Sequence, residues 1–189
     1  MKNKQTIIRL VFIAVYAALA VVLDYVSQLI PFLQMPNGGS IELELIPIFI
    51  ASYHLGVKDG AITGFMWWAI SFVLGLNSYY LTFIQYILDY FIPFIIIGFA
   101  SAMPRIWKIS NIYTGITITM IIKYISQTLS GVYFWFPETT YAGSIEAWIY
   151  SAGYNLWYNL ATMIVCLIIV PVLIEVVKKG NKTKFIGVK

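Results

Sequence analysis

Few residues of this chain could do chemistry in an apolar environment, and Asp89 is the clearest of them. It is the one formal charge between Gly60 and Pro104, well inside an apolar segment rich in aromatic residues. A carboxylate there needs a cation or a hydrogen-bond donor, and ionisable residues within membrane segments usually mark functional sites. Asp89 therefore either forms a structural ion pair with the equally isolated Lys123 or faces a ligand, and we favour the ligand.

A second group of candidate contacts lies toward the end of a later apolar segment. Gln127, Gly131 and Trp135 are spaced four residues apart, so in a helix they share one face. An amide, a gap without a side chain and a flat ring suit the wall of a site for a planar heterocycle, although such residues more often serve packing. Together with Asp89, they suit a small cationic aromatic ligand, held by charge and by cation–π attraction.

Composition indicates that helices in a bilayer position these residues. The chain has 189 residues, of which 60% are hydrophobic and 11% charged, whereas about 25% of an ordinary soluble domain is charged. A soluble globular protein is thereby excluded. Turn-forming residues and charges divide the chain into six apolar segments, most of them near the about 20 residues that cross a bilayer. The sequence predicts an all-α integral membrane protein, a single membrane domain over residues 1–189 with six transmembrane helices at about 7–33, 41–53, 61–76, 80–103, 111–134 and 147–177.

The basic residues predict the orientation of this bundle. With the N-terminus in the cytoplasm, 11 of the 12 lysines and arginines fall on the cytoplasmic side, as the positive-inside rule requires. Both termini are therefore expected to be cytoplasmic, and this placement of the charges does not indicate nucleic-acid binding. We expect the first segment to stay in the protein as a helix and not to be cleaved as a signal peptide. We expect a break in it near Pro31 and a kink in the fourth segment at Pro93. The second is short and begins with acidic residues, so we expect it to be tilted or re-entrant and covered by protein.

Motifs of enzymes are absent from the sequence. It contains no P-loop, no H-E-x-x-H and no G-x-S-x-G. The single histidine, His54, lacks partners that would converge on a metal or a substrate, so a loop or interface position is expected. The single cysteine, Cys166, is expected to be a small buried apolar residue. We therefore predict no catalytic residues, no metal and no cofactor. The alternatives to a ligand-binding membrane protein are an intramembrane enzyme and a purely structural assembly subunit.

Several short segments, by their order and spacing, resemble one known family. They are Met35-Pro36-Asn37-Gly38-Gly39-Ser40 followed by Ile46-Pro47-Ile48, then Leu55-Gly56-Val57-Lys58-Asp59-Gly60, Gln85-Tyr86-Ile87-Leu88-Asp89-Tyr90, Ser130-Gly131-Val132-Tyr133-Phe134-Trp135 and Tyr150-Ser151-Ala152-Gly153-Tyr154-Asn155. With them the chain resembles, over nearly its whole length, the thiamine-specific S components (the ThiT/YuaJ family) of energy-coupling factor (ECF) vitamin transporters.

The resemblance implies a thiamine pocket near the outer surface, closed by the loop after the first helix. It implies that Asp89 recognises the aminopyrimidine, that Trp135 stacks on the ligand and that Gly131 contributes a backbone contact. Where the family commonly has a histidine this chain has Gln127, which cannot carry charge. A thiamine analogue, or a precursor such as hydroxymethylpyrimidine, is therefore an alternative ligand. The remaining implied contacts are Glu42, Tyr79, Tyr150 and Asn155.

The resemblance also implies partners and a location. S components work with a membrane-embedded coupling protein and a pair of ATP-binding cassette ATPases, in agreement with the missing P-loop. Ala14 and Ala18 match the small-residue motif by which the family docks, because small side chains let another helix approach closely. Without the resemblance, packing within the bundle would explain them equally well. The implied protein is a multi-pass subunit of a bacterial cell membrane that takes up thiamine and alters nothing chemically.

Overall fold

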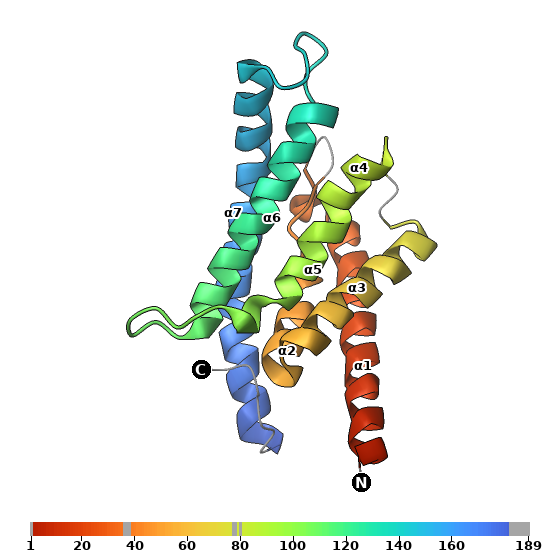
Figure 1. Ribbon diagram of the computed structural model, residues 1–189, viewed down its shortest axis with the longest axis vertical. Coiled ribbons are helices and arrows are strands. Elements are labelled where there is room, and N and C mark those ends of the chain that lie inside the picture. Colours follow the sequence, from red (N-terminus) through yellow and green to blue (C-terminus); the bar gives the residue numbers. More distant parts are fainter. Residues whose placement is uncertain (1, 36–38, 77–78, 80, 182–189) are drawn as a thin grey trace.

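The structure is a bundle of helices, shown in Figure 1. The computed structural model describes residues 2–35, 39–76, 79 and 81–181. Within these residues the α4, η2 and α5 elements run on without a break, so that seven α-helices make six helical segments. The elements are α1 (Lys2–Leu29), η1 (Pro31–Leu33), α2 (Leu45–Leu55), α3 (Val57–Leu74), α4 (Phe83–Tyr86), η2 (Ile87–Phe91), α5 (Ile92–Gly98), η3 (Ala100–Ala102), α6 (Asn111–Phe134) and α7 (Ile145–Asn181). The predicted all-helical fold is confirmed.

The shortest of the expected spans forms the centre of the bundle. All 11 residues of α2 are buried, and the helix contacts α1, α3, α5 and α7. At a rise of 1.5 Å per residue α2 is only about 16 Å long, half the thickness of a bilayer core. Its apolar side chains, such as Phe49, make up much of the hydrophobic core. The expectation that protein covers this segment is confirmed.

The fourth segment is irregular at the turn that carries Asp89. Residues Ile87–Phe91 form a π-helix, in which the Ile92 N–H donates to the Ile87 carbonyl. Pro93 follows and has no N–H, and its ring cannot fit against a regular α-turn. The Leu88 carbonyl instead accepts a hydrogen bond from Ser126 Oγ of α6 at 2.7 Å. The irregularity expected at Pro93 therefore lies one turn earlier, in a π-turn of a kind that is frequent at functional sites.

The long helices α1, α6 and α7 give the bundle its length. The start of α1 and the end of α7 lie at the same end of the molecule, and α6 runs from that end to the opposite one (Figure 1). By length and composition, two of the described helices could span a membrane, Gln5–Leu29 within α1 and Ile145–Lys179 within α7. The segments Leu45–Leu55 and Phe83–Gly98 are apolar but shorter.

Glycines let α3 and α5 touch through their backbones. A Cβ added to Gly60 would lie 2.6 Å from the carbonyl oxygen of Gly98 and 2.6 Å from Cα of Ser52. Neither atom belongs to a side chain that could turn away, so the helices would have to separate. The Ser52 hydroxyl also depends on this approach, because it donates to the Gly98 carbonyl at 2.6 Å.

We expect Gly60→Ala to destabilise the protein by about 2 kcal/mol or more, as overpacking of a close contact does. Gly153 is the matched control, since it lies within α7 and a Cβ there would meet nothing within 4 Å. Gly153→Ala should stabilise the helix by about 0.5 to 1 kcal/mol. Thermal unfolding in detergent measures both. Equal midpoints for the two variants would contradict the close approach of α3 and α5.

Candidate functional site

The structure contains a cavity of about 890 Å³ between the helices. It lies in the half of the bundle where α6 ends and α7 begins, opposite the start of α1 (Figure 1). Volumes of about 300 to 1,000 Å³ are usual for small-molecule sites. The cavity is lined by every residue for which the sequence predicted a ligand contact, namely Glu42, Tyr79, Asp89, Gln127, Gly131, Trp135, Tyr150 and Asn155.

Asp89 enters the cavity from the π-turn and is only partly buried. Its Oδ2 accepts hydrogen bonds from Gln85 Nε2, one turn earlier, and from the Trp135 indole Nε1 at 3.1 Å. Both donors reach the same oxygen, so Oδ1 is the atom with capacity for a ligand. The Trp135 ring is thereby fixed beside the carboxylate. A carboxylate and a flat aromatic face thus lie side by side at this end of the cavity.

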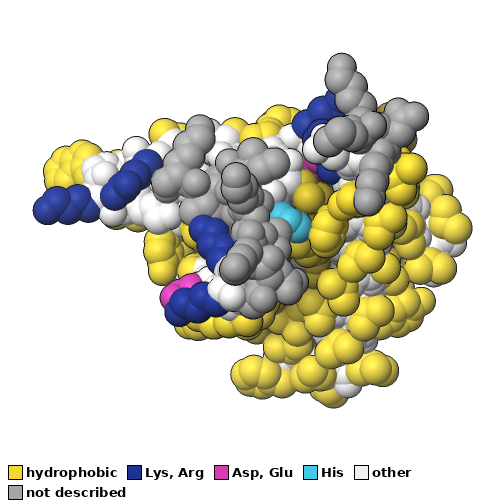
Figure 2. Space-filling view, turned by 90° about the horizontal axis from the view of Figure 1, so that it is seen from below, with side chains coloured by type: hydrophobic (Ala, Val, Ile, Leu, Met, Phe, Trp, Pro, Cys, Tyr) yellow, Lys and Arg dark blue, Asp and Glu magenta, His cyan; other side chains and the backbone are white. Residues whose placement is uncertain are grey.

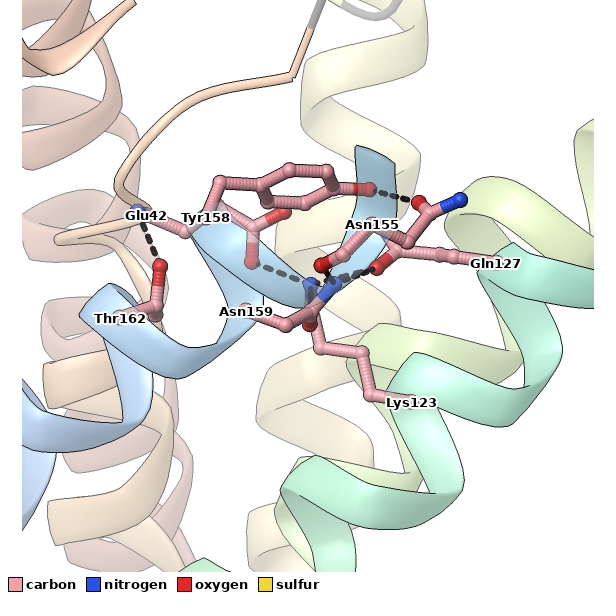
Figure 3. A network of polar contacts seen from close by, with 7 residues as sticks. All are labelled: Glu42, Lys123, Gln127, Asn155, Tyr158, Asn159 and Thr162. Atoms are coloured by element: carbon pink, nitrogen blue, oxygen red, sulfur yellow. Dashed lines mark hydrogen bonds and ion pairs between the residues drawn. The ribbon is translucent and has the colours of Figure 1, made fainter. Parts of the chain in front are cut away.

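Lys123 does not pair with Asp89, and that alternative is wrong. The Lys123 side chain is fully buried and forms an ion pair with Glu42 at 2.7 Å. Its Nζ also donates to Gln127 Oε1 at 2.8 Å and to Asn159 Oδ1 at 2.9 Å. Figure 3 shows these groups converging from α6, α7 and the segment before α2. An ammonium has three donors, so the lysine is satisfied within the protein.

Gln127 and Asn155 are held in place by neighbours. Gln127 Oε1 accepts from Lys123 and, at 3.0 Å, from Asn159 Nδ2, which leaves the amide NH₂ of Gln127 as its available group. Asn155 Nδ2 donates to the carbonyl and the hydroxyl of Ser151, and its Oδ1 accepts from the Tyr158 hydroxyl. Its amide hydrogens are both used, so Asn155 offers a ligand an acceptor only. Asn155 also holds Ser151 and Tyr158 in position.

Aromatic rings cover one wall of the cavity. Tyr150 and Tyr154 of α7 stack with centroids 6.0 Å apart, and Tyr154 meets Tyr158 edge-on at 6.1 Å. The Lys123 ammonium lies 5.5 Å from the centre of the Tyr158 ring. Tyr79 is 72% exposed, and its carbonyl accepts from the Tyr90 hydroxyl at 3.1 Å. Tyr79 therefore stands at the rim of the cavity.

Gly131 lines the cavity but also serves packing. A Cβ there would collide with Ser151 Oγ of α7. Ser151 Oγ in turn donates to the Thr128 carbonyl of α6 at 2.8 Å. The glycine thus allows α6 and α7 to approach, which fixes the spacing of the side chains on both walls.

Several polar residues of the cavity were not predicted as ligand contacts, among them Asp24, Gln28 and Glu44. All three line it, and Gln28 Nε2 donates to Asp24 Oδ1 at 3.0 Å. Asp24 stands within the apolar part of α1, so the rule that singled out Asp89 applies to it equally. The position of Glu44, at the N-terminal end of the buried helix α2, was a weaker signal.

Four other residues discussed from the sequence, Ala14, Ala18, His54 and Cys166, lie outside the cavity lining. Ala14 and Ala18 are exposed on α1, whereas Ala17 beside them is 1% exposed. Packing within the described bundle therefore does not account for Ala14 and Ala18. His54 is buried at the end of α2, where its Nδ1 and the Tyr16 hydroxyl share a hydrogen bond of 2.8 Å. This is an interface between α1 and α2. Cys166 is buried, as expected.

Comparison with known proteins identifies the family. A family model described as "Thiamine transporter protein (Thia_YuaJ)" matches residues 10–182. The Thiamine transporter ThiT of Bacillus subtilis (strain 168) is 34% identical, over 92% of this chain and 93% of its own. A solved structure of ThiT from Listeria monocytogenes shares the fold, with a TM-score of 0.73, 23% identity, and coverage of 93% of this chain and 97% of that chain. These proteins are transporters, not enzymes. The chain belongs to the Thia_YuaJ family of thiamine transporter proteins.

Proposed function

We propose that the protein is the substrate-binding S component of an ECF-type transporter and captures extracellular thiamine for uptake driven by ATP. The observation that carries the proposal is the convergence of eight residues, drawn from five separate parts of the chain, on one cavity of about 890 Å³. The cavity combines carboxylates with aromatic rings, a combination suited to a ligand that joins an aminopyrimidine to a cationic thiazolium ring.

The aminopyrimidine is placed at Asp89. Oδ1 of the carboxylate accepts from the ring's amino group, while Gln85 and Trp135 hold Oδ2 and keep the side chain in one orientation. The indole face of Trp135 stacks on the ligand. The Gln127 NH₂ and the hydroxyl of Tyr150 add polar contacts, and Gly131 adds backbone. Tyr79, at the rim, covers the ligand once it is bound.

The protein is proposed to span a bacterial cell membrane as one domain over residues 1–189, with six helices and both ends in the cytoplasm. Figure 2 views the end where α1 begins and α7 ends, and lysine and arginine side chains lie at several places on it. Basic residues gather on the cytoplasmic side of membrane proteins, which supports this orientation. The cavity then opens outward. The described basic residues on segments near the viewed end are Arg9, Lys58, Arg105, Lys108, Lys178 and Lys179.

The partners are a membrane-embedded coupling protein and a pair of ATP-binding cassette ATPases. The exposed Ala14 and Ala18 lie one turn apart on α1, where small side chains allow a partner helix to approach closely. We expect the Ala14→Leu and Ala18→Leu variants to bind thiamine as the wild type does but to lose most uptake. Val172→Leu, which enlarges an exposed residue of α7, is the control and should transport normally. Loss of binding in the alanine variants would contradict a docking role.

Uptake of labelled thiamine tests the proposed function. The chain is expressed with and without the coupling protein and ATPases in bacteria that cannot take up thiamine. We expect accumulation only when all components are present, and membrane-bound thiamine with the chain alone. Labelled hydroxymethylpyrimidine is run in parallel. Accumulation of hydroxymethylpyrimidine but not of thiamine would show that the pyrimidine is the substrate. Accumulation of neither compound by the complete, membrane-inserted assembly would overturn the proposal.

A further inference from the structure

Two carboxylates of the cavity, Asp24 and Glu44, each have one oxygen without a hydrogen-bond partner in the described part of the chain. Asp24 is 8% exposed and Glu44 4% exposed, and both line the cavity. Among the described residues, none donates a hydrogen bond to Asp24 Oδ2 or to Glu44 Oε2. Asp24 comes from α1 and Glu44 from the turn before α2, so two separate elements bring the two acids to the same cavity.

The nearby Lys123 makes its direct contacts elsewhere. Lys123 already uses its three donors on Glu42, Gln127 and Asn159. Two further ion pairs join Arg9 to Asp59 and Lys179 to Glu175, away from the cavity lining. Glu42 is therefore balanced by Lys123, whereas Asp24 and Glu44 are not.

A buried charge without a partner is costly, and three acids together make it worse. Glu44 experiences repulsion from Glu42 and from Asp24, and a smaller attraction from Lys123. Apolar or amide side chains at positions 24 and 44 would avoid this cost entirely. Ionisable residues inside membrane segments usually mark functional sites, and a bound cation would balance acids that no basic side chain contacts. The observations therefore indicate a cation subsite in this part of the cavity.

We propose that Asp24 and Glu44 hold the permanently charged ring of the ligand, and that Glu42 acts chiefly as the partner of Lys123. This assignment rests on the proposed function, since it takes the ligand to be thiamine. It divides recognition between two places: Asp89 on the fourth segment reads the aminopyrimidine, and the Asp24–Glu44 pair balances the thiazolium charge. Attraction between unit charges acts over several ångströms in a buried site, so the pair needs no direct hydrogen bond to the ring.

The test compares thiamine with 3-deazathiamine, a neutral isostere in which carbon replaces the charged ring nitrogen. Dissociation constants for both are measured by calorimetry on the purified full chain, for the wild type, Asp24→Asn and Glu44→Gln. Each variant should weaken thiamine binding by about tenfold or more and leave 3-deazathiamine binding within about twofold. Glu146→Gln is the matched control, because Glu146 is an exposed acid outside the cavity lining, and it should change neither constant.

Stability of the empty protein separates binding from a structural role. Neutralising a buried unpaired charge should leave the unfolding midpoint unchanged or raise it, whereas loss of a structural carboxylate would lower it. A lowered midpoint with an equal loss of both ligands would overturn the proposal. So would thiamine binding that requires Na⁺ or K⁺ at constant ionic strength, because an inorganic ion would then supply the charge. If the wild type binds neither ligand, the proposed function itself has failed.

Discussion

We expect Lys123→Met to unfold about 6 to 20 °C below the wild type. Removing one member of a buried ion pair costs about 3 to 5 kcal/mol, and each kcal/mol shifts the midpoint by about 2 to 4 °C in a chain of this size. The cost arises because Glu42 is left buried without its partner at 2.7 Å. Gln127 and Asn159 lose the donor that orients them at the same time.

The physical reason can be separated from simple loss of packing. In the double variant Glu42→Gln, Lys123→Met no charge is left unpaired, so most of the lost stability should return. Lys179→Met is the matched control, since Lys179 pairs with Glu175 on the exposed end of α7, where such pairs contribute little. A double variant no more stable than Lys123→Met would show that the ion pair is not the cause.

We expect Asp89→Asn to raise the dissociation constant for thiamine by about 10- to 150-fold, because a hydrogen bond to a charged group contributes about 1.5 to 3 kcal/mol. The substitution keeps an oxygen that can accept from Gln85 and Trp135. The free protein should therefore unfold at nearly the wild-type temperature. Affinity is measured by tryptophan fluorescence and stability by thermal unfolding.

Glu138→Gln provides the matched control for Asp89. Glu138 is an exposed acid of the loop between α6 and α7 and does not line the cavity. Its neutralisation should change thiamine affinity by less than about twofold. Equal affinity in Asp89→Asn and the wild type would remove Asp89 from the site, and a large effect of Glu138→Gln would indicate that net charge alone governs binding.

Local patterns predicted the elements and the cavity wall well. The expected span 111–134 has the same bounds as α6, because serine caps its start and a run of apolar residues with few charges continues to Phe134. Gln127, Gly131 and Trp135 share a face by helical spacing alone, and all three line the cavity. The short, acidic second segment was expected to be covered by protein because its length does not suit lipid, and α2 is buried throughout.

Contacts between distant parts of the chain could not be predicted in the same way. Nothing in spacing joins Lys123 to Glu42, 81 positions earlier, in preference to Asp89. The π-turn at Ile87–Phe91 depends on Ser126 of another helix, which replaces the donor that Pro93 lacks. Such features follow from how the helices pack, and no pattern within one segment contains them.

If the proposed function is right, the cavity binds thiamine with its pyrimidine beside Trp135. Intrinsic tryptophan fluorescence of the purified protein, titrated with thiamine, tests it most directly. We expect saturable quenching by thiamine at submicromolar concentration, weaker binding of hydroxymethylpyrimidine alone, and loss of most of the quenching in Trp135→Phe. Absence of any saturable change with thiamine, in protein that remains folded, would contradict it.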